Sequence, residues 1–274
     1  MIKDILVTLP MGDAPSFALD YAVTVASTFD AHLTGVAFVQ DPASAWGLFD
    51  RVTALDDYRR EVEAAAEAAE VRFEETWQRE RLSAESMVLN AGGLGLPELL
   101  ARTARRFDLT ILPQADPEDG RSAEVMVEAT LLGSGRPVLI VPYFWEGEVK
   151  FDRILVCWDG SHNAARAIAD AMPFLKRAKQ VEVVTVATDG SSDDRIPGLD
   201  IGHHLSRHGA TIEIRNIIAH SQEVSVRIRS HAAQQSVDLI VMGGYGHSRL
   251  RECILGGATR EILESTVVPT LMSH

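Results

Sequence analysis

Short apolar runs alternate with amphipathic segments along the whole chain. Ten of these runs have the length of a β-strand, and they lie at 3–9, 32–39, 85–90, 108–113, 137–142, 152–158, 180–187, 211–217, 237–242 and 267–272. Helical patterns separate them, and the longest helical pattern covers about residues 56–81. Continuous apolar strands that alternate with helices predict parallel sheets covered by helices on both faces.

The two halves of the chain have the same pattern in the same order. Three pairs of segments correspond: Asp4–Val7 with Arg153–Val156, Arg106–Asp116 with Ser236–Gly246, and Arg136–Tyr143 with Val267–His274. Such internal repetition predicts two copies of one structural unit. We therefore expect two α/β domains, residues 1–146 and 147–274, each a doubly wound, mainly parallel five-stranded sheet of Rossmann-like type.

Ligands of doubly wound sheets bind beyond the carboxyl ends of the strands. In the second unit this rule directs attention to the residues after Trp158 and after Met242. Gly243 and Gly246 follow the fourth predicted strand, and Gly256 and Gly257 precede the last predicted helix. Glycines permit close backbone approach, and a helix start supplies free N–H groups, so the segment could bind a phosphate. It could equally serve only to turn the chain.

These motifs together resemble the universal stress protein family in its tandem form, with an adenine nucleotide alpha hydrolase-like fold. The resemblance covers nearly the whole chain and is strongest in "RILVCWDGS" and "VDLIVMGGYGHSRLRECILGGATREIL". It implies that ATP, accompanied by Mg²⁺ if a metal takes part, binds to the second unit. The phosphates would lie over Gly243, Gly246 and Gly256. The family has Ser or Thr where this chain has Gly257, so the remaining contacts would come from Gly257, Ala258 and Thr259.

The resemblance also implies that Asp159 lies beside the ribose and that the backbone of Val186 meets the adenine. Alternatively, Asp159 caps the following helix and Val186 is a core residue. The first unit lacks these features, because Pro10 and Pro113 stand where the second unit has Asp159 and Gly243. Its acidic residues Asp116, Glu118 and Asp119 would repel phosphates, so we expect no ATP there in the family manner.

Charge and composition narrow the function classes. The 274 residues carry a formal net charge of −13, which argues against binding to nucleic acids or anionic membranes. No apolar run approaches the length of a transmembrane helix, and no secretory signal is visible, so we expect a soluble cytoplasmic protein. No catalytic residue is evident. His204 and His208 have helical i,i+4 spacing, but no third ligand type accompanies them, so no metal site is predicted.

The sequence therefore predicts an ATP-binding regulatory protein linked to stress. One alternative is a scaffold of the same fold that binds no nucleotide, and a second is a slow ATPase, which the absence of an evident general base disfavours. The two units are expected to pair within the chain. The sequence leaves both a monomer and a homodimer open.

Overall fold

The computed structural model describes residues 1–12, 16–39, 52–92, 95–116, 122–145, 147–187, 198–218, 223–245 and 258–274. The N-terminal half comprises β1 (Asp4–Thr8), α1 (Phe17–Phe29), β2 (His32–Val39), α2 (Val52–Glu80), β3 (Ala84–Asn90), α3 (Leu96–Ala104), β4 (Leu109–Pro113), α4 (Ser122–Gly133) and β5 (Val138–Val141). The C-terminal half comprises β6 (Arg153–Cys157), α5 (His162–Leu175), β7 (Gln180–Ala187), α6 (Gly198–Arg207), β8 (Ile212–Ile218), α7 (Val224–Gln234), β9 (Leu239–Gly243), α9 (Ala258–Ser265) and β10 (Thr270–Ser273).

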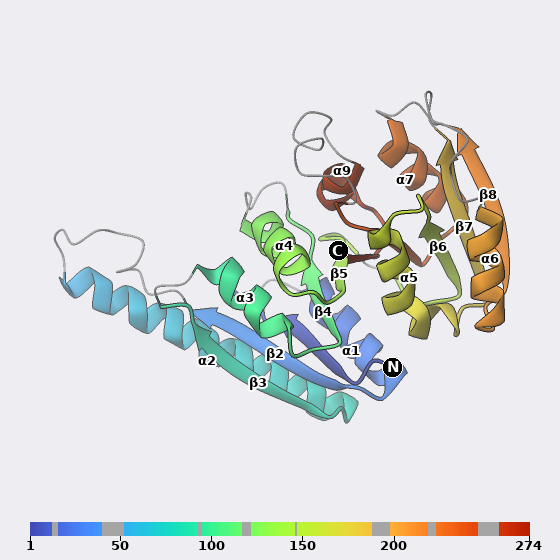
Figure 1. Ribbon diagram of the computed structural model, residues 1–274. Helices are drawn as coiled ribbons and strands as arrows, with labels where there is room; N and C mark the ends of the chain where they lie inside the picture. Colours follow the sequence, from blue (N-terminus) through green and yellow to red (C-terminus); the bar gives the residue numbers. More distant parts are fainter. Residues whose placement is uncertain are drawn as a thin grey trace.

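The ten strands of the described residues form one sheet in the order β3-β2-β1-β4-β5-β10-β9-β6-β7-β8 (Figure 1). Every neighbouring pair is parallel except β5 and β10, which are antiparallel. Within each half the order 3-2-1-4-5 is the doubly wound arrangement that the sequence predicts. The antiparallel pair joins the two halves through their edge strands. The strands of one half therefore run in the opposite direction to those of the other, and the two sets of carboxyl ends lie at opposite ends of the strands in the shared sheet.

The junction has a near two-fold symmetry. Leu139 of β5 pairs with Leu271 of β10, and each is the second residue of its strand. Next to this contact, an aromatic cluster crosses from one half to the other. The ring of Phe174 in α5 lies 4.8 Å from that of Phe29 in α1 and 5.0 Å from that of Phe151, centroid to centroid. The core is therefore continuous across the junction.

Helices cover both faces of the sheet. Buried side chains of α1, α2, α5 and α6 pack in one core cluster, and those of α3, α4, α7 and α9 pack in another. Figure 1 shows α2 running along β2 and extending past its end. Among the described residues, no helix has both the length and the apolar composition needed to cross a membrane.

The strand ends follow from local chemistry. The last strand begins at Thr270 rather than near Val267, because the Thr266 hydroxyl bonds to both the carbonyl and the N–H of Val268 and forms a turn. Pro269 then contributes only its carbonyl, which accepts from the N–H of Ile240. The other nine predicted strands are confirmed to within two residues at each end.

Equivalent contacts confirm the sequence repeat. The Asp108 carboxylate accepts the N–H groups of Lys3 and Asp4 at 2.8 and 3.2 Å. In the second half, the Asp238 carboxylate accepts those of Asp152 and Arg153 at 2.9 and 2.8 Å. Each aspartate precedes the fourth strand of its half and holds the start of the first strand. These paired clamps fix the residue-by-residue correspondence between the halves.

Candidate functional site

The carboxyl ends of β6, β7 and β9 meet at one edge of the sheet. β6 lies between the other two strands and is parallel to both. Asp159 comes two residues after the end of β6, and Gly243 is the last residue of β9. The N–H of Trp158 bonds to the carbonyl of Val184, which places the Val186 backbone near the same end of β7. The Val186 side chain lies outside the described residues.

Asp159 has a structural role in the turn that leads into α5. Its Oδ1 accepts the N–H of Ser161 at 2.9 Å, and Gly160 between them has a φ of 77°. The Ser161 hydroxyl then caps α5 by accepting the N–H of Ala164 at 3.1 Å. Asp159 is exposed, and its Oδ2 makes no hydrogen bond to any described residue. The carboxylate can therefore hold the turn and still accept a hydrogen bond from a ligand.

Gly243 allows a close contact between α5 and β9. A Cβ at this position would lie 2.5 Å from the backbone nitrogen of Ala164 and 2.7 Å from the carbonyl carbon of Asn163. Both of those atoms belong to the first turn of α5, so they cannot move away without shifting the helix. Packing thus accounts for this glycine independently of any phosphate, a reason that the sequence did not suggest.

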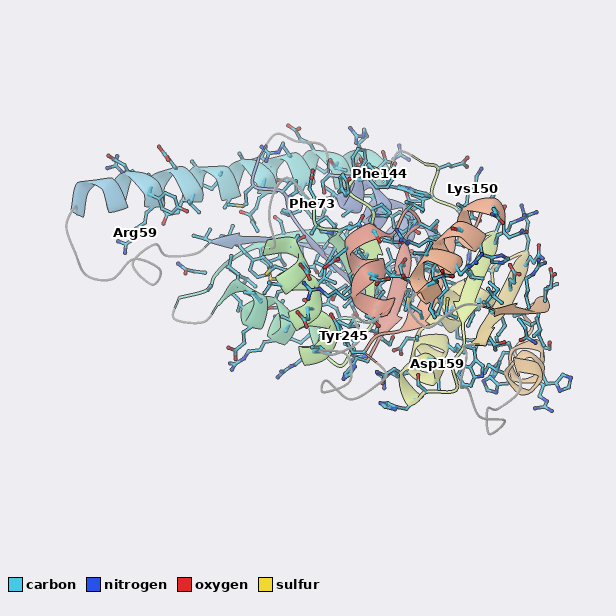
Figure 2. The ribbon with its side chains drawn as sticks, turned by 90° about the horizontal axis from the view of Figure 1, so that it is seen from above. Arg59, Phe73, Phe144, Lys150, Asp159 and Tyr245 are labelled. Atoms are coloured by element: carbon cyan, nitrogen blue, oxygen red, sulfur yellow. The ribbon has the colours of Figure 1, made fainter. Side chains whose placement is uncertain are left out.

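Two helix N-termini converge on the residues Gly243–Tyr245. From α5, the side-chain nitrogen of Asn163 donates to the carbonyl oxygen of Gly244 at 2.5 Å. From α9, the hydroxyl of Thr259 accepts the N–H of Tyr245 at 3.2 Å. Figure 2 shows Asp159 and Tyr245 on the same side of the molecule. Helix N-termini present unpaired N–H groups and a positive dipole end, so this edge favours an anion.

The structure therefore brings Asp159, Gly243 and Thr259 to one edge. Ala258 begins α9, and its side chain lies outside the described residues. Gly246, Gly256 and Gly257 also lie outside the described residues, as do Glu118 and Asp119 of the first half.

Sequence reasoning missed two residues that hold the glycine turn. Asn163 is completely buried, and its Oδ1 has no hydrogen-bond partner in the described structure. His274 places Nδ1 3.0 Å from the Gly244 carbonyl oxygen and 3.0 Å from the Asn163 nitrogen. In the first half, Ala18 occupies the place of Asn163, two residues after the capping serine. A position-by-position alignment of the two halves would have shown this polar residue where the other half has an alanine.

The comparisons with known proteins agree with the second half of this architecture. Residues 150–274 match the model of the universal stress protein family. A universal stress protein of Synechocystis sp. is 28% identical over 138 residues, and the matched segment covers 50% of this chain. That segment is 46% of the relative, so the chain spans about half the length of the curated relative it matches.

The likeness in sequence to the universal stress protein family thus lies in residues 150–274.

Solved structures extend the likeness of fold to the whole chain. A universal stress protein from Archaeoglobus fulgidus has a TM-score of 0.75 and 17% identity, covering 98% of this chain and 95% of its own. A Pseudomonas aeruginosa protein described as a candidate universal stress protein has a TM-score of 0.61 and 16% identity, covering 99% and 93%. At these identities the likeness shows the fold, and it includes both halves.

The first half of the chain has different residues at the corresponding edge. Leu9 donates to Val36 as Trp158 donates to Val184, both at 2.8 Å, so Pro10 corresponds to Asp159. Pro113 likewise corresponds to Gly243, because it pairs with Val141 as Gly243 pairs with Ser273. Neither proline has an N–H to offer a ligand.

Gln114, the next residue, is buried and donates from its side chain to the Leu263 carbonyl of α9 at 3.2 Å. The residue after the fourth strand of the first half therefore bonds across the junction to the other half. The corresponding Gly244 has no side chain that could make such a contact.

Cys157 lies at the end of β6, close to Asp159. Burial, reinforced by the negative charge of Asp159, raises the pKa of the Cys157 thiol to about 12. The thiol therefore stays protonated at neutral pH, where it is a poor nucleophile and a poor metal ligand. This cysteine is not a candidate for catalysis.

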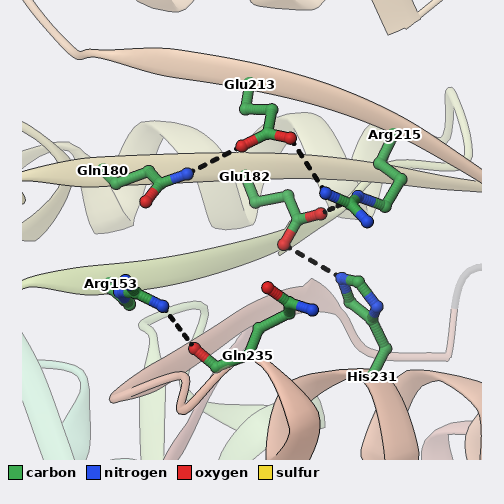
Figure 3. A network of polar contacts seen from close by, with 7 residues as sticks. All are labelled: Arg153, Gln180, Glu182, Glu213, Arg215, His231 and Gln235. Carbon is green, nitrogen blue, oxygen red and sulfur yellow. Dashed lines mark hydrogen bonds and ion pairs between the residues drawn. The ribbon is translucent and has the colours of Figure 1, made fainter.

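A second polar cluster lies near the opposite ends of the strands (Figure 3). Glu182 of β7 is buried, and its two oxygens contact Arg215 Nε at 2.6 Å and His231 Nε2 at 2.9 Å. Arg215 also contacts Glu213 at 2.9 Å. The cluster ties the edge strand β8 and helix α7 to β7. In the first half, buried Thr34 occupies the place of Glu182 in the register.

Proposed function

We propose that the universal stress protein half of this chain, residues 150–274, binds ATP at the carboxyl edge of β6, β7 and β9. One observation carries the proposal: the first turns of α5 and α9 are both hydrogen-bonded to the turn Gly243–Tyr245. Two helix N-termini at one glycine turn bring the positive ends of two helix dipoles close together, which suits a polyphosphate.

The residues that the structure describes fit the other parts of the nucleotide. The free Oδ2 of Asp159 could accept from a ribose hydroxyl while Oδ1 maintains the turn. The adenine would lie beside the end of β7, near the Val186 backbone. Gly246, Gly256, Gly257 and Ala258 would surround the phosphates, with Mg²⁺ bound to the phosphate oxygens. The protein's role would be regulatory, through a nucleotide-bound and a nucleotide-free form.

The first half would bind no ATP and would serve as a structural partner. Pro10 stands in place of the hydrogen-bond acceptor Asp159. Pro113 stands in place of Gly243, which allows close approach of the backbone. The shared sheet and core support a permanent pairing of the two units, with domain limits near residue 146. We also propose that the protein acts in the cytoplasm.

A scaffold that binds no nucleotide is the second candidate, and the Gly243 contact favours it. Because Gly243 is required for packing against α5, its presence does not by itself call for a ligand. Gly257 also lacks the hydroxyl that the family pattern supplies. A slow ATPase is a third reading, and it requires the ATP site as well.

Substitution of Asp159 tests the proposal and separates these readings. Asp159→Asn retains the Oδ1 acceptor of the turn but removes the charge, whereas Asp159→Ala removes both. ATP affinity, measured by calorimetry, should fall about tenfold or more in both variants, as expected for a lost hydrogen bond to a charged group. Binding of 2′,3′-dideoxy-ATP should change little, because that ligand lacks the hydroxyls that Asp159 would bind.

One result would decide against ATP binding, and another would decide against the ribose contact of Asp159. If the wild-type protein neither contains adenine nucleotide when purified and denatured nor binds added ATP with Mg²⁺, the scaffold reading stands. If the wild type binds ATP but both Asp159 variants lose affinity for ATP and for dideoxy-ATP to the same extent, Asp159 acts only through the turn. Steady release of ADP from bound ATP would favour the ATPase.

A further inference from the structure

Two histidines lie one turn apart at the end of α6. The ring centroids of His204 and His208 are 4.7 Å apart, with an angle of 61° between the ring planes. Both side chains are exposed. In the described part of the chain, neither imidazole takes part in a hydrogen bond or an ion pair. Their nitrogens are therefore available to a ligand from solvent.

The separation of the rings matches the geometry of a chelate. With metal–nitrogen bonds of about 2.0–2.1 Å and nitrogen–metal–nitrogen angles of about 90–110°, two chelating imidazoles have centroids about 4.5–5.2 Å apart. The observed 4.7 Å lies within this range. The backbone therefore already holds the two rings, which are in edge-on contact, at a chelating separation, and rotation of the side chains brings one nitrogen of each onto the same ion.

The position on the helix also favours a cation. The N–H groups of His208 and Gly209 bond to the carbonyls of Leu205 and Ser206, both at 3.0 Å, and Gly209 has a φ of 91°. These contacts form the turn that ends α6 at Arg207, so His204 lies in the last turn of the helix and His208 directly follows it. The C-terminal end of a helix carries the negative end of its dipole, which stabilises a positive charge placed there.

We propose that His204 and His208 form a bidentate surface site for a late first-row divalent metal ion such as Zn²⁺ or Ni²⁺. Imidazole is a preferred ligand of these ions, and water would complete the coordination. In the described residues no group of three or more His, Cys, Asp or Glu is arranged to hold a metal, so the site consists of these two side chains. The i,i+4 spacing by itself does not indicate a metal site, and the separation of the two rings is the observation that supports one.

The neighbouring His203 provides a matched control. It belongs to the same helix and lines a surface hollow with Ser206 and Arg207. His203→Ala, His204→Ala and His208→Ala each remove one exposed imidazole from α6. Only the last two should break the chelate.

Calorimetric titration of the full-length, tag-free protein with Zn²⁺ tests the site. His204→Ala and His208→Ala should each weaken the tightest Zn²⁺ binding at least tenfold, because the second ligand acts at a high effective concentration once the first is bound. His203→Ala should bind Zn²⁺ as the wild type does. The inference is wrong if the His204 and His208 variants bind as tightly as the wild type, or if the His203 variant loses as much.

A second readout uses Ni²⁺ and nuclear magnetic resonance. Substoichiometric Ni²⁺ should broaden the ring signals of His204 and His208 together and leave that of His203 sharper. Equal broadening of all three rings would show diffuse surface binding and overturn the site. Because the experiment contains no nucleotide, its outcome is independent of the ATP proposal.

Discussion

The two halves of the chain share a framework and differ in the residues at the carboxyl ends of their strands. Both have the same strand order, the same aspartate clamp before the fourth strand and the same backbone bond after the first strand. Yet Pro10, Ala18 and Pro113 in the first half correspond to Asp159, Asn163 and Gly243 in the second. All three differences cluster at the carboxyl ends of the strands. The fold therefore forms with either set of residues. Gly243 has a structural reason in its close contact with α5, whereas the second carboxylate oxygen of Asp159 has none.

Gly243→Ala should produce the largest loss of stability. Its new Cβ would lie 2.5 Å from the Ala164 nitrogen, so α5 must shift, at a cost of about 1–3 kcal/mol in unfolding free energy. Pro113→Ala at the equivalent place should change stability by less than about 1 kcal/mol. Urea unfolding measures both. Equal effects would show that the close contact between α5 and β9 is not what distinguishes the halves.

The aspartate clamps should behave alike. Asp108→Ala and Asp238→Ala each remove the acceptor of two backbone N–H groups, and each should cost about 1–2 kcal/mol. Circular dichroism during denaturation is a suitable measurement, with Asp108→Asn and Asp238→Asn as variants that retain an acceptor. A large effect in only one half would contradict the shared framework.

Asn163→Ala places the residue of the first half into the second. It removes the bond to the Gly244 carbonyl but also removes an Oδ1 without a partner, so the net cost should be only about 1 kcal/mol. The free energy of ATP binding should be weakened by more than the free energy of unfolding, because the N-terminus of α5 is no longer fixed to the turn. In the reverse exchange, Ala18→Asn should bring no ATP binding to the first half. Unchanged ATP affinity in Asn163→Ala would show that this bond does not organise the site.

The smallest effect concerns Cys157, whose counterpart in the first half is Thr8. Since the pKa of the folded thiol is raised from 9.0 to about 12, the unfolded chain loses its proton first as the pH rises. The contribution of the protonated Cys157 to the free energy of unfolding is complete below pH 9. It decreases above pH 9, by up to about 1 kcal/mol between pH 9 and pH 10. Cys157→Thr should remove this decrease and leave stability at pH 7 nearly unchanged. Identical slopes for both proteins would contradict the raised pKa.

The sequence predicted the framework well because buried parallel strands are continuous apolar runs. The internal repeat then gave the correspondence of Pro10 with Asp159 and of Pro113 with Gly243, which the register confirms. It could not predict that β5 and β10 pair, since nothing in either apolar strand specifies its neighbour at a sheet edge. The doubly wound rule directed attention to the residues after Trp158 and Met242, and so to Asp159, whereas Thr259 came from the family resemblance.

Other features of the site depended on tertiary contacts. The sequence offered a turn or a phosphate as reasons for Gly243, whereas its close contact with α5 depends on how a helix and a strand 80 residues away approach each other. Asn163 reads as an ordinary residue of a helical first turn until Gly244 is placed beside it. The separation of the His204 and His208 rings likewise depends on how the two side chains are placed, which the spacing in the sequence does not give.

The most direct test of the contrast between the halves is the stoichiometry of ATP binding. Calorimetry with ATP and Mg²⁺ should give one site per chain. Gly246→Val should abolish that site by placing a side chain where the phosphates would lie. Asp116→Val, at the equivalent position of the first half, should preserve it. Two sites per chain, or a single site lost with Asp116→Val and retained with Gly246→Val, would contradict the assignment of ATP to the second half.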